Sequence, residues 1–104
     1  DSAHVLRLTG RAAALFSKGD MSEANEDLNG LIARYGHVAA FRVAQVYAWR
    51  GESNPAFEWL EKSVSQHEAA LMYLKFDPLL RSLRNDPRFN VLLAKVNLPT
   101  TPLQ

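Results

Sequence analysis

This sequence contains no cysteine, no long hydrophobic run and no marked excess of either charge. The absence of cysteine excludes disulfide bridges and thiolate metal sites. Every uncharged run falls far short of the roughly 20 apolar residues that a membrane-spanning helix requires, so no membrane segment is expected in this chain. A formal net charge of +1 gives no bulk attraction to nucleic acid or to anionic lipid.

Motifs for catalysis are also missing. No strand-like alternation is present, so no glycine-rich phosphate loop can follow a strand. The histidines His4, His37 and His67 lack the i, i+3 or i, i+4 spacing that pairs two zinc ligands on a helix, and no serine has a recognisable histidine partner. We therefore expect no catalytic, cofactor-binding or metal-binding residue, no cofactor and no enzyme activity in this chain.

One acidic cluster, formed by Glu23, Glu26 and Asp27, resembles a catalytic carboxylate pair at first sight. The cluster falls in the early turns of a predicted helix, where carboxylates oppose the positive end of the helix dipole. This placement explains the cluster without a catalytic role.

The composition that remains is that of a folded domain. Hydrophobic residues make up 47% of the 104 residues, and the charges are interspersed among them, which predicts one small globular unit rather than disorder. The chain begins at Asp1 without a methionine, as expected of a piece of a longer protein. A catalytic domain upstream would then lie outside this fragment.

The most informative pattern is an internal repeat with a period of 32 residues. Five positions of the first stretch recur in the second: Ala12, Leu15, Gly19, Ala24 and Leu28 correspond to Ala44, Tyr47, Gly51, Ala56 and Leu60. A fixed period of about 20–50 residues is typical of solenoids built by stacking similar units. The repeat therefore predicts two similar helical hairpins packed side by side.

Apolar spacing at threes and fours predicts the helices of these hairpins. The expected ranges are about 2–17, 22–35, 37–49 and 55–66. Gly36 is expected to be a left-handed cap after the second helix, and Gly30 to mark a close helix crossing. Asn54 is expected to cap the fourth helix, with Pro55 at its first position, where no amide hydrogen is needed.

The pattern changes after His67. Two Asp-Pro pairs, at 77–78 and 86–87, each combine a capping side chain with a proline that suits the first turn of a helix. They predict a short helical turn and a last helix after an initial helical piece. The expected ranges are 69–74, 78–83 and 87–96, followed by a tail at 97–104.

The alanines of the repeat, Ala12, Ala24, Ala44 and Ala56, suit helices that pack closely, because larger side chains would force them apart. Together with the other repeated positions they resemble the tetratricopeptide repeat, a helix-turn-helix unit. The resemblance implies an all-α domain over residues 1–96, folded as a right-handed α-α superhelix. Its parts are repeat 1 at about 5–36, repeat 2 at about 37–68 and a degenerate closing segment at 69–96.

The second half, AFEWLEKSVSQHE followed by LKFDPLLRSLRNDPRF, resembles the closing segment of tetratricopeptide-repeat tails in bacterial multidomain proteins. Such tails follow nucleotide cyclase domains, winged-helix transcriptional regulators and protein kinases. The resemblance implies a non-catalytic protein–protein interaction or self-association module, fused to a larger cytoplasmic regulatory protein of signal transduction. The rival expectations are a structural spacer and a regulatory helical domain associated with a ligand or nucleic acid.

If the family geometry holds, one face of the first helix in each repeat lines an inner groove. The residues expected on this row are Phe16, Phe41, Gln45, Trp49 and Tyr73. Such an aromatic-rich row suits a helix or extended peptide from a partner, or a second copy of the chain. The alternative is that the closing segment folds back and fills the groove, so that these residues form ordinary core. No pair of groove lysines or arginines suits a C-terminal carboxylate.

Two further expectations concern the ends of the domain. Arg81, Arg84 and Arg88 are expected to pair with Asp77 and Asp86 and with carbonyl groups at helix ends rather than to form a ridge for phosphate, which would require unopposed basic clusters. The N-terminal hairpin lacks an evident polar capping face, so it is expected to stack on upstream repeats or on a second copy.

Overall fold

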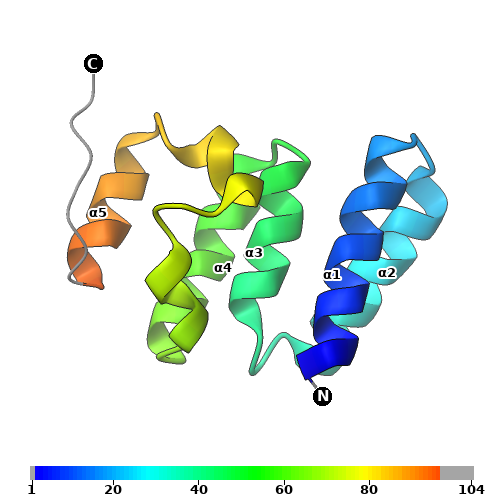
Figure 1. The fold of residues 1–104 in the computed structure, drawn as a ribbon, viewed down its shortest axis with the longest axis horizontal. Helices are drawn as coiled ribbons and strands as arrows, with labels where there is room; N and C mark the ends of the chain where they lie inside the picture. The colour runs from blue at the N-terminus through cyan, green and yellow to red at the C-terminus, as the bar shows by residue number, and fades with distance from the viewer. Residues whose placement is uncertain (1, 97–104) are drawn as a thin grey trace.

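The computed structural model describes residues 2–96, and every regular element in that range is helical. The helices are α1 Ser2–Ser17, α2 Met21–Tyr35, α3 Ala40–Trp49, α4 Ser53–Ser65, the 3₁₀ helices η1 Ala69–Tyr73 and η2 Pro78–Leu83, and α5 Pro87–Lys95. α1 pairs with α2 and α3 pairs with α4 as hairpins (Figure 1). The predicted tail, 97–104, lies outside the described residues.

The two hairpins turn in the same way, 32 residues apart. Gly19 and Gly51 have φ angles of 83° and 77°, a left-handed conformation that glycine adopts without steric cost. The Gly19 amide donates to the Phe16 carbonyl at 3.0 Å, and the Gly51 amide donates to the Ala48 carbonyl at 3.0 Å. The period read from the sequence is therefore present in the backbone of the turns.

The hairpins pack through small side chains. The four repeated alanines have no exposed surface: Ala12, Ala24, Ala44 and Ala56. This confirms that the repeat marks buried helix contacts, where a larger side chain would need the helices to move apart. Two apolar clusters result, one among α1, α2 and α3, and a larger one that joins α3 and α4 to the closing segment.

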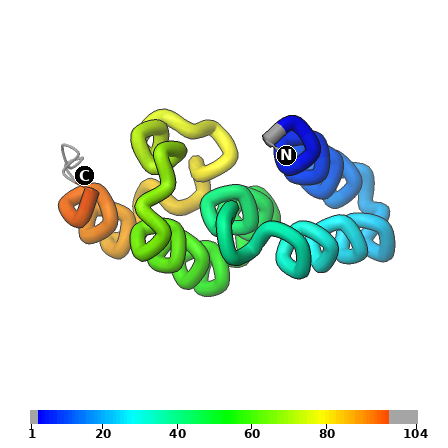
Figure 2. The backbone as a smooth tube through the Cα atoms, turned by 90° about the horizontal axis from the view of Figure 1, so that it is seen from below, coloured from blue at the N-terminus to red at the C-terminus, as the bar shows by residue number. Residues whose placement is uncertain are grey.

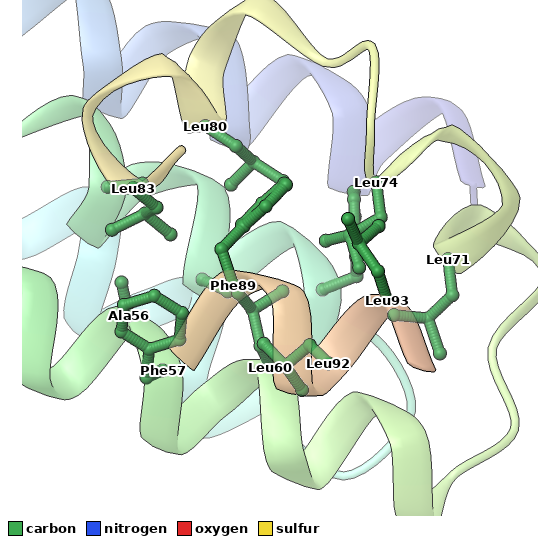
Figure 3. Close-up of a cluster of buried hydrophobic side chains, with 13 residues drawn as sticks. Ala56, Phe57, Leu60, Leu71, Leu74, Leu80, Leu83, Phe89, Leu92 and Leu93 are labelled. Atoms are coloured by element: carbon green, nitrogen blue, oxygen red, sulfur yellow. The ribbon is translucent and has the colours of Figure 1, made fainter. Parts of the chain in front are cut away.

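The closing segment contributes most of the larger cluster (Figure 3). Leucines from η1, η2 and the chain between them meet Leu92 and Leu93 of α5 there: Leu71, Leu74, Leu80 and Leu83. Asp77 and Asp86 begin η2 and α5 as predicted, because their carboxylates accept the amides of Leu79 and Arg88, each at 2.9 Å. The Asp-Pro pairs thus place two apolar turns over the second hairpin.

The glycine predictions for α2 were wrong. Gly36 has φ −55°, which is right-handed; a Cβ there would stand 2.6 Å from the Ile32 carbonyl oxygen and 3.1 Å from the Trp59 ring. Gly36 is thus required by close approach rather than by a left-handed angle. Gly30 marks no close crossing, because a Cβ there would meet nothing within 4 Å.

Two helix starts also differ from prediction. α3 begins at Ala40 rather than 37, after a turn. α4 begins at Ser53, so Asn54 lies inside the helix and Glu52 precedes it without a side-chain cap. The Asn54 Oδ1 instead accepts a hydrogen bond from Arg88 at 3.0 Å, which connects α4 to the start of α5.

Candidate functional site

Three adjoining pockets follow α3 on the side where α1 and the segment 69–83 stand opposite each other (Figure 2). Their volumes are about 450, 350 and 460 Å³ from the N-terminal to the C-terminal end of α3. The first and middle pockets share Arg42 and Ala70, and the middle and third pockets share Pro78. They therefore adjoin one another along α3, and we call the three together the α3 groove.

The α3 groove gathers the exposed apolar side chains of the molecule. Among residues 2–96, eight large apolar side chains are exposed, and five of them line the groove: Leu6, Val38, Trp49, Tyr73 and Phe76. Their exposed fractions range from 45% for Trp49 to 76% for Phe76. The other three, Met21, Met72 and Val91, do not line it. Clustered exposed apolar surface with a polar rim is typical of interaction sites.

The five residues predicted to line a groove differ in the structure: some are exposed on the α3 groove, some are buried, and one lies outside it. Trp49 and Tyr73 lie exposed on the groove. Phe41 is 1% exposed at the base of the middle pocket and belongs to the larger core cluster. Gln45 is buried, and its amide donates to the Asp77 carboxylate. Phe16 lines none of the three pockets and lies half-buried near the Arg50 guanidinium, 5.2 Å from the ring centre.

The closing segment therefore covers part of α3 and leaves the rest open. η2 packs over the Phe41 side of α3, as the filled-groove alternative expected, while the strip toward α1 remains accessible. Phe76, which was not among the five predicted groove residues, is the most exposed of the large apolar residues that line the groove. No periodic pattern marks it, because it lies in the turn between two short 3₁₀ helices.

Hydrogen bonds attach both walls of the groove to α3. The Trp49 Nε1 donates to Ser17 Oγ at 2.8 Å, which joins the end of α1 to the end of α3. Ser82 Oγ donates to the Ala48 carbonyl at 2.7 Å, which attaches η2 to the same end of α3. The C-terminal end of α3 is thus attached both to α1 and to η2.

At the other end, side chains from the loop after α4 cap α3. The Ala40 amide donates to Gln66 Oε1 at 3.4 Å, and the Phe41 amide donates to the Glu68 carboxylate at 3.3 Å. Gln66 Nε2 also donates to the Gly36 carbonyl at 3.1 Å. These bonds satisfy amides that a helix start leaves without partners. Burial raises the pKa of the Glu68 carboxyl above its ordinary value of 4.5, although the Phe41 amide opposes the shift.

The raised pKa of Glu68 predicts a specific pH dependence. Ionisation of Glu68 is harder in the folded state, so stability from this group is present at low pH and is lost as the pH rises through 4.5 and the higher folded pKa. Glu68→Gln keeps an acceptor for the Phe41 amide without a charge. Its unfolding free energy relative to wild type should increase from pH 4 to pH 7, measured by urea titration.

Glu68→Ala is the matched variant, because it removes the acceptor as well as the charge. It should lose about 1 kcal/mol at pH 4, where the wild-type carboxyl is largely neutral. A difference between Glu68→Gln and wild type that does not change with pH would contradict the assignment.

Other candidate sites have local explanations. Arg11 pairs with Glu23 at 3.2 Å and Asp27 at 3.1 Å, so most of the acidic cluster joins α1 to α2. His4 Nδ1 lies 2.7 Å from the Tyr35 hydroxyl. No group of three or more potential metal ligands occurs in the described part of the chain, and no helix there is long and apolar enough to cross a membrane.

The arginines of the closing segment do not form one basic ridge. Arg88 pairs with Asp86 at 2.8 Å as expected and lowers the pKa of that carboxyl. Arg84 instead donates to the Asp77 backbone carbonyl at 3.0 Å. Arg81 is exposed and lines the third pocket of the α3 groove.

Fold and surface together define a small all-helical domain built from two packed hairpins and a closing segment, with an apolar groove along α3. No family model, no curated protein and no solved structure matches the chain.

Proposed function

We propose that this chain is a non-catalytic protein–protein interaction module whose α3 groove binds a segment of a partner protein. The observation that carries the proposal is the gathering of exposed apolar side chains along the groove, from Leu6 and Val38 at one end to Trp49 at the other. A few aromatic anchors in such pockets supply most of the affinity in many interfaces.

We further propose that the hairpins are tetratricopeptide-like repeats of a right-handed α-α superhelix, with 69–96 as its degenerate closing unit. The common geometry of the Gly19 and Gly51 turns and the buried alanines of the repeat support this proposal. The resemblance of the closing segment supports a place at the end of a larger, cytoplasmic, bacterial regulatory protein. No feature of the described residues favours the spacer role or the ligand-associated or nucleic-acid-associated role.

The proposal is tested by selecting 16-residue peptides from a random displayed library on the immobilised chain. Binding of selected peptides should weaken by about tenfold or more in Phe76→Ser and in Trp49→Ser, because each substitution removes an exposed aromatic anchor. Both variants should remain folded, since these side chains are 76% and 45% exposed. Fluorescence anisotropy measures the affinities, and circular dichroism verifies folding.

Met72→Ser is the matched control, because Met72 is 71% exposed in η1 and lies outside the α3 groove. It should leave the affinity unchanged. Failure to select any peptide, or peptides that bind Phe76→Ser and Trp49→Ser as tightly as wild type, would overturn the proposed function. Phe41→Ser should unfold the chain, because Phe41 is core, so it does not serve as a binding test.

A further inference from the structure

The charged side chains of the α3 groove differ in whether they already form hydrogen bonds to charged or backbone groups within the chain. Its carboxylates have internal partners: Glu68 accepts the Phe41 amide, and Asp77 accepts the Leu79 amide and the Gln45 side chain. These bonds belong to helix starts and to the attachment of the closing segment. An occupant of the groove therefore meets carboxylates that are already hydrogen-bonded.

The guanidinium groups of the groove have no such pairing. Arg42 donates to the neutral Gln45 Oε1 at 3.0 Å and lies 5.8 Å from the centre of the Phe41 ring. Neither Arg42 nor Arg81 forms an ion pair with a described residue. Arg42 stands where the first and middle pockets join, and Arg81 lines the third. The charged groups of the groove that keep open hydrogen-bonding capacity are thus the guanidinium groups of Arg42 and Arg81, although the charge of Arg42 also acts on the Glu68 carboxyl in the same pocket.

The surface formed by residues 2–96 does not supply a matching occupant. Such an occupant needs several apolar side chains in a row beside carboxylates, but the large apolar side chains that these residues expose outside the groove are the scattered Met21, Met72 and Val91. Val91 stands alone on α5, where the nearby Arg88 and Lys95 already pair with Asp86 and Glu61. The N-terminal hairpin exposes charges of both signs, Arg7, Arg11 and Lys18 beside Asp20, Glu23 and Glu26, but Met21 is the one large apolar side chain that its described residues expose outside the groove. A second copy is therefore a poor match for the groove.

We infer that the groove recognises an acidic amphipathic segment of a different protein, an inference that rests on the proposed function. Apolar side chains of the segment fill the pockets, and carboxylates pair with Arg42 and Arg81. From Arg42 to Trp49 the groove follows eight residues of α3, a rise of about 10 Å. That length matches about two turns of a bound helix or three residues of an extended chain, so a 16-residue segment spans it in either form.

The experiment selects 16-residue peptides from the same random library and determines the charge of those whose binding depends on Phe76 or Trp49. We expect enrichment of Asp and Glu next to apolar residues. A chosen acidic peptide should lose about three- to tenfold in affinity to Arg81→Glu, because the substitution replaces attraction with repulsion. Raising the salt from 0.05 to 0.5 M should weaken wild-type binding and reduce the difference between the two proteins. Over this range of salt the Debye screening length becomes shorter than the α3 groove.

Arg34→Glu is the matched control, because it makes the same charge change at an exposed position in the last turn of α2, outside the groove. It should leave binding within about twofold of wild type. Arg42→Glu repeats the test at the junction of the first two pockets, and circular dichroism verifies that each variant folds.

The outcomes separate this inference from the proposed function. Selected peptides that are neutral or basic, yet lose affinity in Phe76→Ser, would overturn the acidic specificity and leave the groove as a binding site. Acidic peptides that bind Arg81→Glu and Arg42→Glu as well as wild type would also overturn it. If no selected peptide depends on Phe76 or Trp49, both the function and its specificity are wrong.

Discussion

Phe89→Ala is expected to lower the free energy of unfolding by about 3–5 kcal/mol, the usual loss when a buried phenylalanine is truncated in a core. Phe89 is 1% exposed and belongs to the cluster that joins the closing segment to α3 and α4 (Figure 3). Such a loss is a large share of the roughly 5–15 kcal/mol that stabilises most domains. Urea denaturation followed by circular dichroism at 222 nm, about the helix minimum, measures the change.

Val91→Ala is the control on the same helix. Val91 is 54% exposed, so its truncation should change the stability by about 0.5 kcal/mol or less. A loss below about 1 kcal/mol in Phe89→Ala would show that α5 is dispensable to the core. The closing segment would then contribute little to the stability of the core, and its packing would not hold one wall of the α3 groove in place.

Gly36→Ala should lower the stability by about 1–3 kcal/mol, because the added methyl group has no room. The nearest atoms to that Cβ are the Ile32 carbonyl oxygen at 2.6 Å and the Trp59 ring at 3.1 Å. The backbone oxygen cannot move without disturbing the end of α2, where the Gly36 amide donates to it at 3.0 Å. Thermal and urea unfolding of the purified variant measure the loss.

Gly30→Ala makes the same chemical change in the interior of the same helix, where nothing lies within 4 Å of the new Cβ. It should raise the stability by about 0.5–1 kcal/mol, because alanine is the better helix former. The two glycine variants should thus shift unfolding in opposite directions. Equal shifts would contradict the close approach of Gly36 to Trp59.

The sequence predicted local features well where the chemistry is local. The glycine turns at Gly19 and Gly51 follow from the backbone freedom that a left-handed residue needs. Asp77 and Asp86 start their helices because each carboxylate reaches an amide only two residues ahead. The all-helical class and the two hairpins follow from apolar periodicity and from the repeat.

Predictions that depended on distant neighbours were less accurate. Gly30 and Gly36 lie six positions apart, but only Gly36 must stay small, because the Ile32 carbonyl oxygen and the distant Trp59 ring both approach it. Likewise, Phe41 and Trp49 belong to one aromatic row in the sequence. Packing with α4 and the closing segment buries the first in the larger core cluster and leaves the second exposed, and no local pattern encodes that difference.

By itself, the sequence determined the helices, the 32-residue hairpin repeat and the Asp-Pro turns, since each depends on residues within a few positions or on a regular period. Only the tertiary structure decided how α3 begins and which of its faces remains open. Gln66 and Glu68 reach the amides of Ala40 and Phe41 from more than 25 positions away. The α3 groove arises for the same reason, because α1 and the segment 69–83 become its walls only when packing places them beside α3.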